Sequence, residues 1–202
     1  MDTSDPVVYV IDDDDAVRES LKWLISSIDI EVKVFASATN FLEQCHQVST
    51  GCLITDVRMP GLSGLDLQNE LKKRGIEIPV VVITGHGDVQ MAVRAMKAGV
   101  FDFIEKPFND QYLLDLVNRA VIQSQTSKNE KTHQDELRAR LETLTPREQE
   151  VMELIVDGEA NKNIALKLGI SDKTVEAHRA KVMTKMQAHS LPELVKMVLE
   201  LS

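Results

Sequence analysis

The residues best suited to chemistry in this sequence are acidic, hydroxyl and amine side chains that each follow a short apolar run. Asp12 and Asp13 come directly after the first run, and Asp56 comes after the third. Thr84 and Lys106 follow the fourth and fifth runs. If the first strand lies beside the third in the sheet, the three carboxylates converge. Carboxylate oxygens that gather without His or Cys suit a hard cation such as Mg²⁺. A metal ion would offset the repulsion between the carboxylates and accept oxygens of an incoming phosphoryl group.

Asp56 could then act as a nucleophile and form an aspartyl phosphate. Phosphoryl transfer requires mainly positioning and charge stabilisation, which Mg²⁺ and the positive charge of Lys106 would supply. The Thr84 hydroxyl is placed to donate a hydrogen bond to a phosphoryl oxygen. Taken alone, the acidic run has a plainer interpretation, because Asp14 or Asp15 can cap the next helix. Five groups at the ends of four strands form a more specific pattern than any one of them.

The elements that would position these side chains alternate regularly over the first 122 residues. Buried strands are predicted for the apolar runs Val7–Ile11, Val32–Phe35, Cys52–Thr55, Val80–Thr84 and Phe101–Ile104. Helices are predicted for the amphipathic segments Ala16–Ile28, Ala38–His46, Gly64–Arg74, Asp88–Ala98 and Gln111–Ile122. Strict alternation indicates a doubly wound parallel sheet with helices on both faces, and sites in such folds form at the carboxyl ends of the strands.

Beyond this domain, Gln123–His133 is polar and has no apolar anchor, so it is either a linker or an exposed helix extension. Leu137, Leu141 and Leu144 return at helical spacing. They could pair with a partner chain, but we favour docking of the linker. The predicted division is therefore a first domain over residues 1–122, a partly helical linker over residues 123–143, and a second domain over residues 144–202.

The second domain is predicted to be all helical, with four helices. Thr145-Pro146-Arg147-Glu148 is a capping box that opens a helix ending near Gly158. Asn161–Leu168 and residues 172–187 are predicted helices on either side of a tight turn, Gly169-Ile170-Ser171, and Ser190 opens the fourth. This is the outline of a helix-turn-helix, whose second helix would enter the major groove of DNA.

The second helix of this outline has two faces. Val175, Val182 and Met186 repeat at helical spacing and should face the core. The other face carries Lys173, Thr174, Glu176, Ala177, Ala180 and Lys181, with His178 and Arg179 at its flanks. Small alanines allow close approach to base edges, while lysine and arginine can reach phosphates or guanine. From spacing alone, an interaction helix with ordinary surface charge is an equal alternative.

Composition sets limits on the class of protein. The net charge is −9, which argues against a generic nucleic-acid coat protein. The acid excess lies in residues 1–122, so a DNA contact must come from a local face of the second domain. No apolar run approaches the about 18 residues of a membrane span, and Met1–Pro6 does not resemble a signal peptide. We therefore expect a cytoplasmic protein without membrane contact, in which Cys45 and Cys52 are reduced and structural.

Long runs of this sequence resemble two-component response regulators, most closely the FixJ-like group. They are VYVIDDDDAVRESL, LITDVRMPGLSGLDL, PVVVITGHGDVQMAVRAMKAGVFDFIEKPF and LTPREQEVMELIVDG, and ANKNIALKLGISDKTVEAHRAKVMTKM resembles the LuxR/NarL-type helix-turn-helix. The resemblance implies a flavodoxin-like receiver domain with a five-stranded parallel sheet of order 2-1-3-4-5. It implies Asp56 as phosphoacceptor, and Mg²⁺ (or Mn²⁺ as a substitute) bound by Asp12, Asp13, Asp56 and the Arg58 carbonyl.

The resemblance also implies that Thr84 and Lys106 sense the phosphate, and that the Lys106-Pro107 bond is cis. Thr84 and Phe103 match the family's switch positions, although Phe103 lacks the hydroxyl of many relatives and could equally belong to the core. The implied DNA-facing residues are Lys173, Thr174, Glu176, Ala177, His178, Arg179 and Lys181. His178 could instead be a packed histidine, and which of these residues contact bases is open.

The implied function is transcription regulation by a non-enzyme. A sensor histidine kinase would phosphorylate Asp56, and the phosphorylated chain would bind promoter DNA and act on RNA polymerase. Phosphorylation would drive homodimerisation, relieve contact between receiver and effector, or both, through the face formed by Asp88–Ile104. Met91, Val93 and Met96 lie on that face, and an exposed subset of them could form a dimer patch.

Three other classes of protein could carry some of these features. A Mg²⁺-dependent phosphohydrolase typically carries a second acid two residues after its nucleophile, where Arg58 stands here. A nucleotide-binding protein is disfavoured because no GxGxxG or Walker motif follows the first strand. A regulator that works through protein contacts alone would not need the full set of Asp13, Asp56, Thr84 and Lys106.

Overall fold

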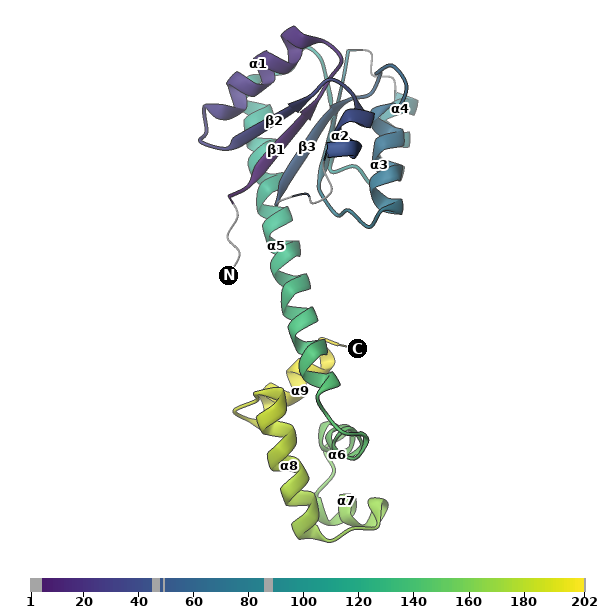
Figure 1. Cartoon of the computed structure of the whole chain (residues 1–202), viewed down its shortest axis with the longest axis vertical. Coiled ribbons are helices and arrows are strands. Elements are labelled where there is room, and N and C mark those ends of the chain that lie inside the picture. Colours follow the sequence, from purple (N-terminus) through teal and green to yellow (C-terminus); the bar gives the residue numbers. More distant parts are fainter. Residues whose placement is uncertain (1–4, 45–47, 49, 86–88, 202) are drawn as a thin grey trace. The chain divides into compact units, whose positions relative to one another are not determined.

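The computed structural model describes residues 5–44, 48, 50–85 and 89–201, and the chain divides into two compact units, residues 1–128 and 129–202. The first unit is built on a five-stranded sheet and the second on helices (Figure 1). Among the described residues, no helix has the length and apolar character needed to cross a membrane.

The sheet of the first unit is parallel, with the order β2-β1-β3-β4-β5 that the sequence predicts. Its strands are β1 (Val7–Ile11), β2 (Glu31–Phe35), β3 (Gly51–Asp56), β4 (Val80–Thr84) and β5 (Asp102–Glu105). Every residue of β1 and β4 is buried. These strands lie between two layers of helices, which is why they appear in the sequence as continuous apolar runs.

Helices cover both faces of this sheet (Figure 1). They are α1 (Asp15–Ser26), α2 (Ala38–Gln44), α3 (Gly64–Lys73), α4 (Val89–Ala98) and α5 (Asp110–Glu142). Buried residues of α1 and α5 pack in one core cluster, and those of α2, α3 and α4 pack in the other. Observed boundaries differ from the predicted ones by a few residues. The predicted positions Cys45, His46 and Asp88 lie outside the described part of the chain.

The helix α5 is much longer than predicted. It does not end at Ile122 but continues to Glu142, so the polar stretch Gln123–His133 is a helix extension. Residues 125–136 are all exposed. Backbone hydrogen bonds within a helix do not require an apolar face, and residues 123–142 contain no glycine or proline that would end the helix. The limits of the linker and of the two domains stay predictions.

The second unit packs α6 (Pro146–Val156), α7 (Asn161–Leu168), α8 (Asp172–Met186) and α9 (Leu191–Leu199) around one core. Thr145, Ser171 and Ser190 are the N-caps of α6, α8 and α9, as the sequence indicates. Leu137 and Leu144 are buried, and Leu141 packs against the core cluster. The prediction that these leucines dock is therefore confirmed.

A buried acid fastens the start of α6 to the end of α8. One oxygen of Glu148, Oε2, accepts hydrogen bonds from the Thr145 backbone N–H at 2.9 Å and from Lys185 Nζ at 2.6 Å. The Glu148 side chain is only 4% exposed. The Lys185 hydrogen bond and the Thr145 N–H lower the pKa of Glu148 from 4.5 to about 2. Glu148 is therefore ionised at neutral pH and links two helices of the core.

Acid should weaken the second unit through Glu148. Because its folded pKa is depressed, the stabilisation is complete above pH 4.5 and is lost as the pH falls towards about 2. We expect Glu148→Gln to lower the protection of α6 amides at neutral pH, measured by hydrogen–deuterium exchange of the full chain. The difference from wild type should shrink as the pH approaches about 2.

Glu153→Gln is the matched control, because Glu153 is exposed on the same helix. An equal loss of protection in both variants would show that the contacts of Glu148 do not stabilise α6. A difference that persists undiminished at the acid end would contradict the assigned pKa.

Candidate functional site

Two carboxylates and an amine meet at the carboxyl edge of the sheet. Asp12 directly follows β1, Asp56 is the last residue of β3, and Lys106 directly follows β5. Lys106 Nζ lies 3.1 Å from Asp12 Oδ2 and 3.2 Å from Asp56 Oδ1. The side chains of Asp12 and Asp56 are only 5% and 11% exposed. Residues 94 and 50 positions apart in the chain thus form one partly buried ionic cluster.

Backbone groups hold the carboxylates in this cluster. The second oxygen of Asp12, Oδ1, accepts a hydrogen bond from the Asp14 N–H at 2.9 Å. The second oxygen of Asp56, Oδ2, accepts one from the Arg58 N–H at 2.6 Å. Lys106 is placed by its own N–H, which donates to the Thr84 carbonyl at 2.7 Å, and the bond to Pro107 is cis as expected. Backbone hydrogen bonds therefore help to orient each of the three charged side chains in addition to the ionic contacts between them.

Lys106 keeps its charge in this environment. Partial burial lowers its pKa, but the hydrogen bonds and negative charges of Asp12 and Asp56 outweigh burial, and the net pKa is raised. A lysine already charged at neutral pH thus becomes harder to deprotonate. The site presents a permanent positive charge within reach of Asp56.

The third predicted carboxylate is placed differently. The expectation that three aspartates converge is met by Asp12 and Asp56, whereas Asp13 is exposed. Across the described residues, no three His, Cys, Asp or Glu side chains are arranged to hold a metal ion. Carboxylates repel one another at short range, and the cation shared by Asp12 and Asp56 here is Lys106.

The two predicted switch residues lie on the neighbouring strands β4 and β5. Thr84 ends β4 and is 1% exposed. Phe103, in β5, is half-buried and packs against the core cluster that includes α4. Of the residues on α4, Met91 packs on the same cluster, whereas Val93 and Met96 are 46% and 54% exposed. The exposed subset expected on α4 is therefore Val93 and Met96.

Two further residues contact the backbone of the acids, and the sequence pattern did not predict them. Arg18 is buried on α1 and donates to the Asp12 carbonyl. In the sequence, Arg18 could have been noticed as a basic residue within the apolar stripe of that helix. Gly64 opens α3, and a Cβ there would lie 2.4 Å from the Asp56 carbonyl oxygen. A glycine at the start of a helix can mark such a close backbone approach, but sequence alone does not say to what.

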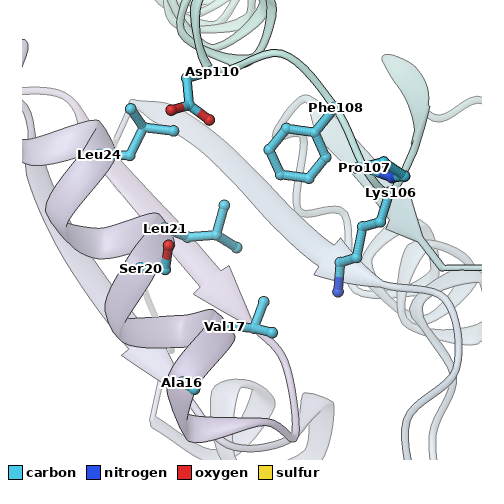
Figure 2. A pocket seen from close by; sticks show the side chains of 9 residues that line it. All are labelled: Ala16, Val17, Ser20, Leu21, Leu24, Lys106, Pro107, Phe108 and Asp110. Carbon is cyan, nitrogen blue, oxygen red and sulfur yellow. The ribbon is translucent and has the colours of Figure 1, made fainter.

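An apolar groove of about 420 Å³ opens beside Lys106, between α1 and the segment that leads into α5. Figure 2 shows Val17, Leu21 and Leu24 projecting from α1 across the groove from Phe108 and Lys106. The remaining lining residues are Ala16, Ser20, Pro107 and Asp110. The groove provides an apolar surface directly next to the ionic cluster.

The helix-turn-helix outline of the second unit is present in α7 and α8. Gly169 takes a left-handed conformation (φ 66°) at the end of α7, and Ser171 caps α8. Val175, Val182 and Met186 are buried, as predicted. Lys173, Thr174, Glu176, Ala177 and Lys181 are exposed, and His178 and Arg179 are half-buried. Such an exposed face is suited to the major groove of DNA.

The two flanking residues of this face differ in their contacts. Arg179 Nη1 donates to Asn161 Oδ1 on α7 at 3.1 Å. His178 Nδ1 is buried without a hydrogen-bond partner among the described residues. Arg179 is thus oriented by α7, and one side of the His178 ring is packed.

Comparison with known proteins identifies both units. The family described as response regulator receiver domain matches residues 8–118, and the family described as bacterial regulatory proteins, luxR family, matches residues 142–198. The chain is 50% identical to transcriptional regulatory protein FixJ of Azorhizobium caulinodans, over 95% of this chain and 91% of that protein. It is 46% identical to FixJ of Rhizobium meliloti, over 97% of this chain and 96% of that protein.

A solved structure agrees with these matches. The response regulator StyR is 43% identical, the match covers 98% of this chain and 100% of that one, and the TM-score is 0.89. The similarity covers nearly the whole length of each protein, both units included. The chain belongs to the FixJ-like two-component response regulators: it is a transcription regulator, not an enzyme, with a receiver domain followed by a LuxR-type helix-turn-helix DNA-binding domain.

Proposed function

We propose that a sensor histidine kinase phosphorylates this chain on Asp56, and that the phosphorylated chain binds promoter DNA as a homodimer and acts on RNA polymerase. We place this activity in the cytoplasm. The observation that carries the proposal is the cluster at the sheet edge, where a charged Lys106 lies 3.2 Å from Asp56. This pairs a nucleophile with a fixed positive charge, which phosphoryl transfer needs.

In the proposed reaction, a carboxylate oxygen of Asp56 attacks the phosphorus of a phosphohistidine. A P–O bond forms, the P–N bond breaks, and the imidazole keeps the electron pair. Lys106 stabilises the negative charge on the phosphoryl oxygens, and its raised pKa keeps it protonated throughout. The Thr84 hydroxyl, next to Lys106 in the fold, binds a phosphoryl oxygen once the acyl phosphate has formed.

The residues at this edge fit a hard divalent cation, because all of the donors are oxygens. Asp12, Asp13, Asp56 and the Arg58 carbonyl would hold Mg²⁺, with Mn²⁺ as a substitute. When bound, the metal would neutralise charge on the carboxylates and on the phosphoryl group. Asp13 is exposed and adjacent to buried Asp12, so its side chain is accessible to a cation from solvent.

The proposed output begins at Thr84 and Phe103. A shift of the Thr84 hydroxyl towards the phosphate would change the packing of Phe103, which contacts the core cluster under α4. Val93 and Met96 expose apolar surface on α4, and this patch is the proposed contact between two phosphorylated chains. Two copies would then bind a two-fold symmetric DNA site through Lys173, Thr174, Glu176, Ala177, His178, Arg179 and Lys181.

The groove beside Lys106 is the proposed docking site of the kinase. A protein that delivers a phosphoryl group to Asp56 must contact the surface around the cluster, and the groove is the apolar part of that surface. An apolar side chain of the kinase would bury itself between Leu24 and Phe108 (Figure 2). This contact would select the kinase without taking part in the chemistry.

Replacing Asp56 tests the phosphorylation site. Incubation with acetyl phosphate should give the wild type a slow band on a Phos-tag gel that Asp56→Asn lacks. Phosphorylated wild type should bind promoter DNA about 5- to 150-fold more tightly than Asp56→Asn in a gel shift, the usual range of coupling between two sites. Equal DNA affinity of the two proteins after this treatment would remove phosphorylation from the mechanism.

Filling the groove tests kinase docking. Ser20→Trp places a large ring among the lining residues from an exposed position. We expect phosphotransfer from any purified kinase that phosphorylates the wild type to slow by about tenfold, which corresponds to about 1.4 kcal/mol of lost binding. Labelling by acetyl phosphate should not change, because the cluster is intact. Ser26→Trp is the control, since Ser26 is exposed on α1 outside the groove. Equal slowing in both variants would reject the docking site.

Removing one positive charge from α8 tests the DNA-binding face. Lys181→Ala should weaken binding to fragments of any sequence and reduce the slope of log affinity against log salt by about 1, if the lysine neutralises one phosphate. Lys196→Ala removes an exposed lysine of α9 and should leave the slope unchanged. A slope that falls equally in both variants, or in neither, would place the phosphate contact elsewhere.

A further inference from the structure

We propose that Arg18 is a positioning residue for the phosphorylation site: its guanidinium fixes the peptide between Asp12 and Asp13 and so orients Asp13 towards the incoming cation. This inference rests on the proposed function, because it assumes that Asp13 is a metal ligand. Arg18 lies on α1, one turn beyond the acidic run, and no part of the reaction described above uses it.

One hydrogen bond and one ion pair define the position of Arg18. Its Nη1 donates to the Asp12 backbone carbonyl at 2.5 Å, and its Nη2 forms an ion pair with the Asp15 carboxylate. The Arg18 side chain is 11% exposed, whereas Asp15 is 91% exposed. The guanidinium is therefore buried beneath the acidic run, and its buried contact is with a backbone oxygen.

Packing alone does not explain an arginine here. The other buried residues of α1 are Leu21 and Ile25, one and two turns further along the same face. A leucine at position 18 would continue that stripe without the cost of burying a charge. Arg18 instead forms a hydrogen bond with the loop that carries the acids.

The contact acts directly on Asp13. The Asp12 carbonyl belongs to the planar peptide that ends at the Asp13 nitrogen, so fixing its oxygen fixes the plane before Asp13. The next peptide is held as well, because the Asp14 N–H donates to Asp12 Oδ1. Asp14 is in turn the N-cap of α1 and accepts from the Ala16 and Val17 amides. Asp13 thus lies between two tethered peptides.

The planar fork of an arginine is important for this role. Its two terminal nitrogens hold the Asp12 carbonyl and the Asp15 carboxylate at once, in a fixed relative direction. Lysine would retain the positive charge but present one flexible ammonium group. Glutamine would retain a donor for the carbonyl but lose the charge. The two substitutions therefore separate orientation from simple charge balance.

The experiment is a titration of the full-length chain with Mg²⁺ in the absence of a phosphodonor. Binding is measured from the NMR chemical shifts of the backbone amides in the acidic run. Outer-shell partners of metal ligands typically contribute about 10- to 100-fold to metal affinity. We expect the Mg²⁺ dissociation constant to rise about tenfold in both Arg18→Lys and Arg18→Gln. Labelling by acetyl phosphate should need correspondingly more Mg²⁺, but its rate at saturating Mg²⁺ should stay close to that of the wild type.

Arg119→Gln is the control, because it makes the same chemical change at an exposed position of α5 and should bind Mg²⁺ as the wild type does. If the wild type shows no Mg²⁺-dependent shifts, the proposed metal site itself fails. If the wild type binds Mg²⁺ and Arg18→Lys binds it equally well, the positioning role is overturned, whatever Arg18→Gln does. The Lys variant therefore decides the question even if the Gln variant does not fold.

Discussion

The site depends on charge balance at one edge of a parallel sheet. Strand order places β1 beside β3, and β5 beyond β4, so that Asp12 and Asp56 both reach the ammonium group of Lys106. Two carboxylates face one ammonium group there, so the formal charge of the cluster is negative. That residual charge favours a further cation, and the raised pKa of Lys106 keeps its ammonium group charged, so that the two carboxylates stay partly compensated. The proposed chemistry at Asp56 follows from this balance.

In the second unit, a buried ion pair stabilises the helix that is suited to DNA binding. A DNA-binding helix must present polar side chains on one face while its other face holds the fold together, and α8 does this with three buried residues along its length. Its last turn is fastened to α6 by the ion pair of Lys185 with Glu148, whose second role is to complete the capping box with Thr145. One buried carboxylate therefore sets both the start of α6 and the position of the end of α8.

Sequence patterns predicted the elements well wherever burial controls them. The strands of the first unit and the stripe of α8 are apolar because both are packed, so periodicity finds them. The continuation of α5 to Glu142 was missed because an exposed polar helix leaves no apolar period. At the site, the pattern predicted that Asp12, Asp13 and Asp56 converge beside Lys106, and the structure brings Asp12 and Asp56 to that lysine. It did not predict that Lys106 bridges both acids, that Asp13 faces solvent, or that Gly64 touches the Asp56 backbone, because these depend on contacts between distant segments.

The helix α1 combines several of these requirements in one element. Its buried face packs on the sheet through Leu21 and Ile25, and its first turn is capped by Asp14 from within the acidic run. Val17 and Leu24 form one wall of the groove beside Lys106, while Arg18 holds the Asp12 carbonyl. A movement of α1 would therefore alter the groove and the acidic loop together. A kinase that docks on α1 would contact the same helix that orients the acids. Binding of the kinase and the orientation of the acidic loop would therefore be coupled through α1.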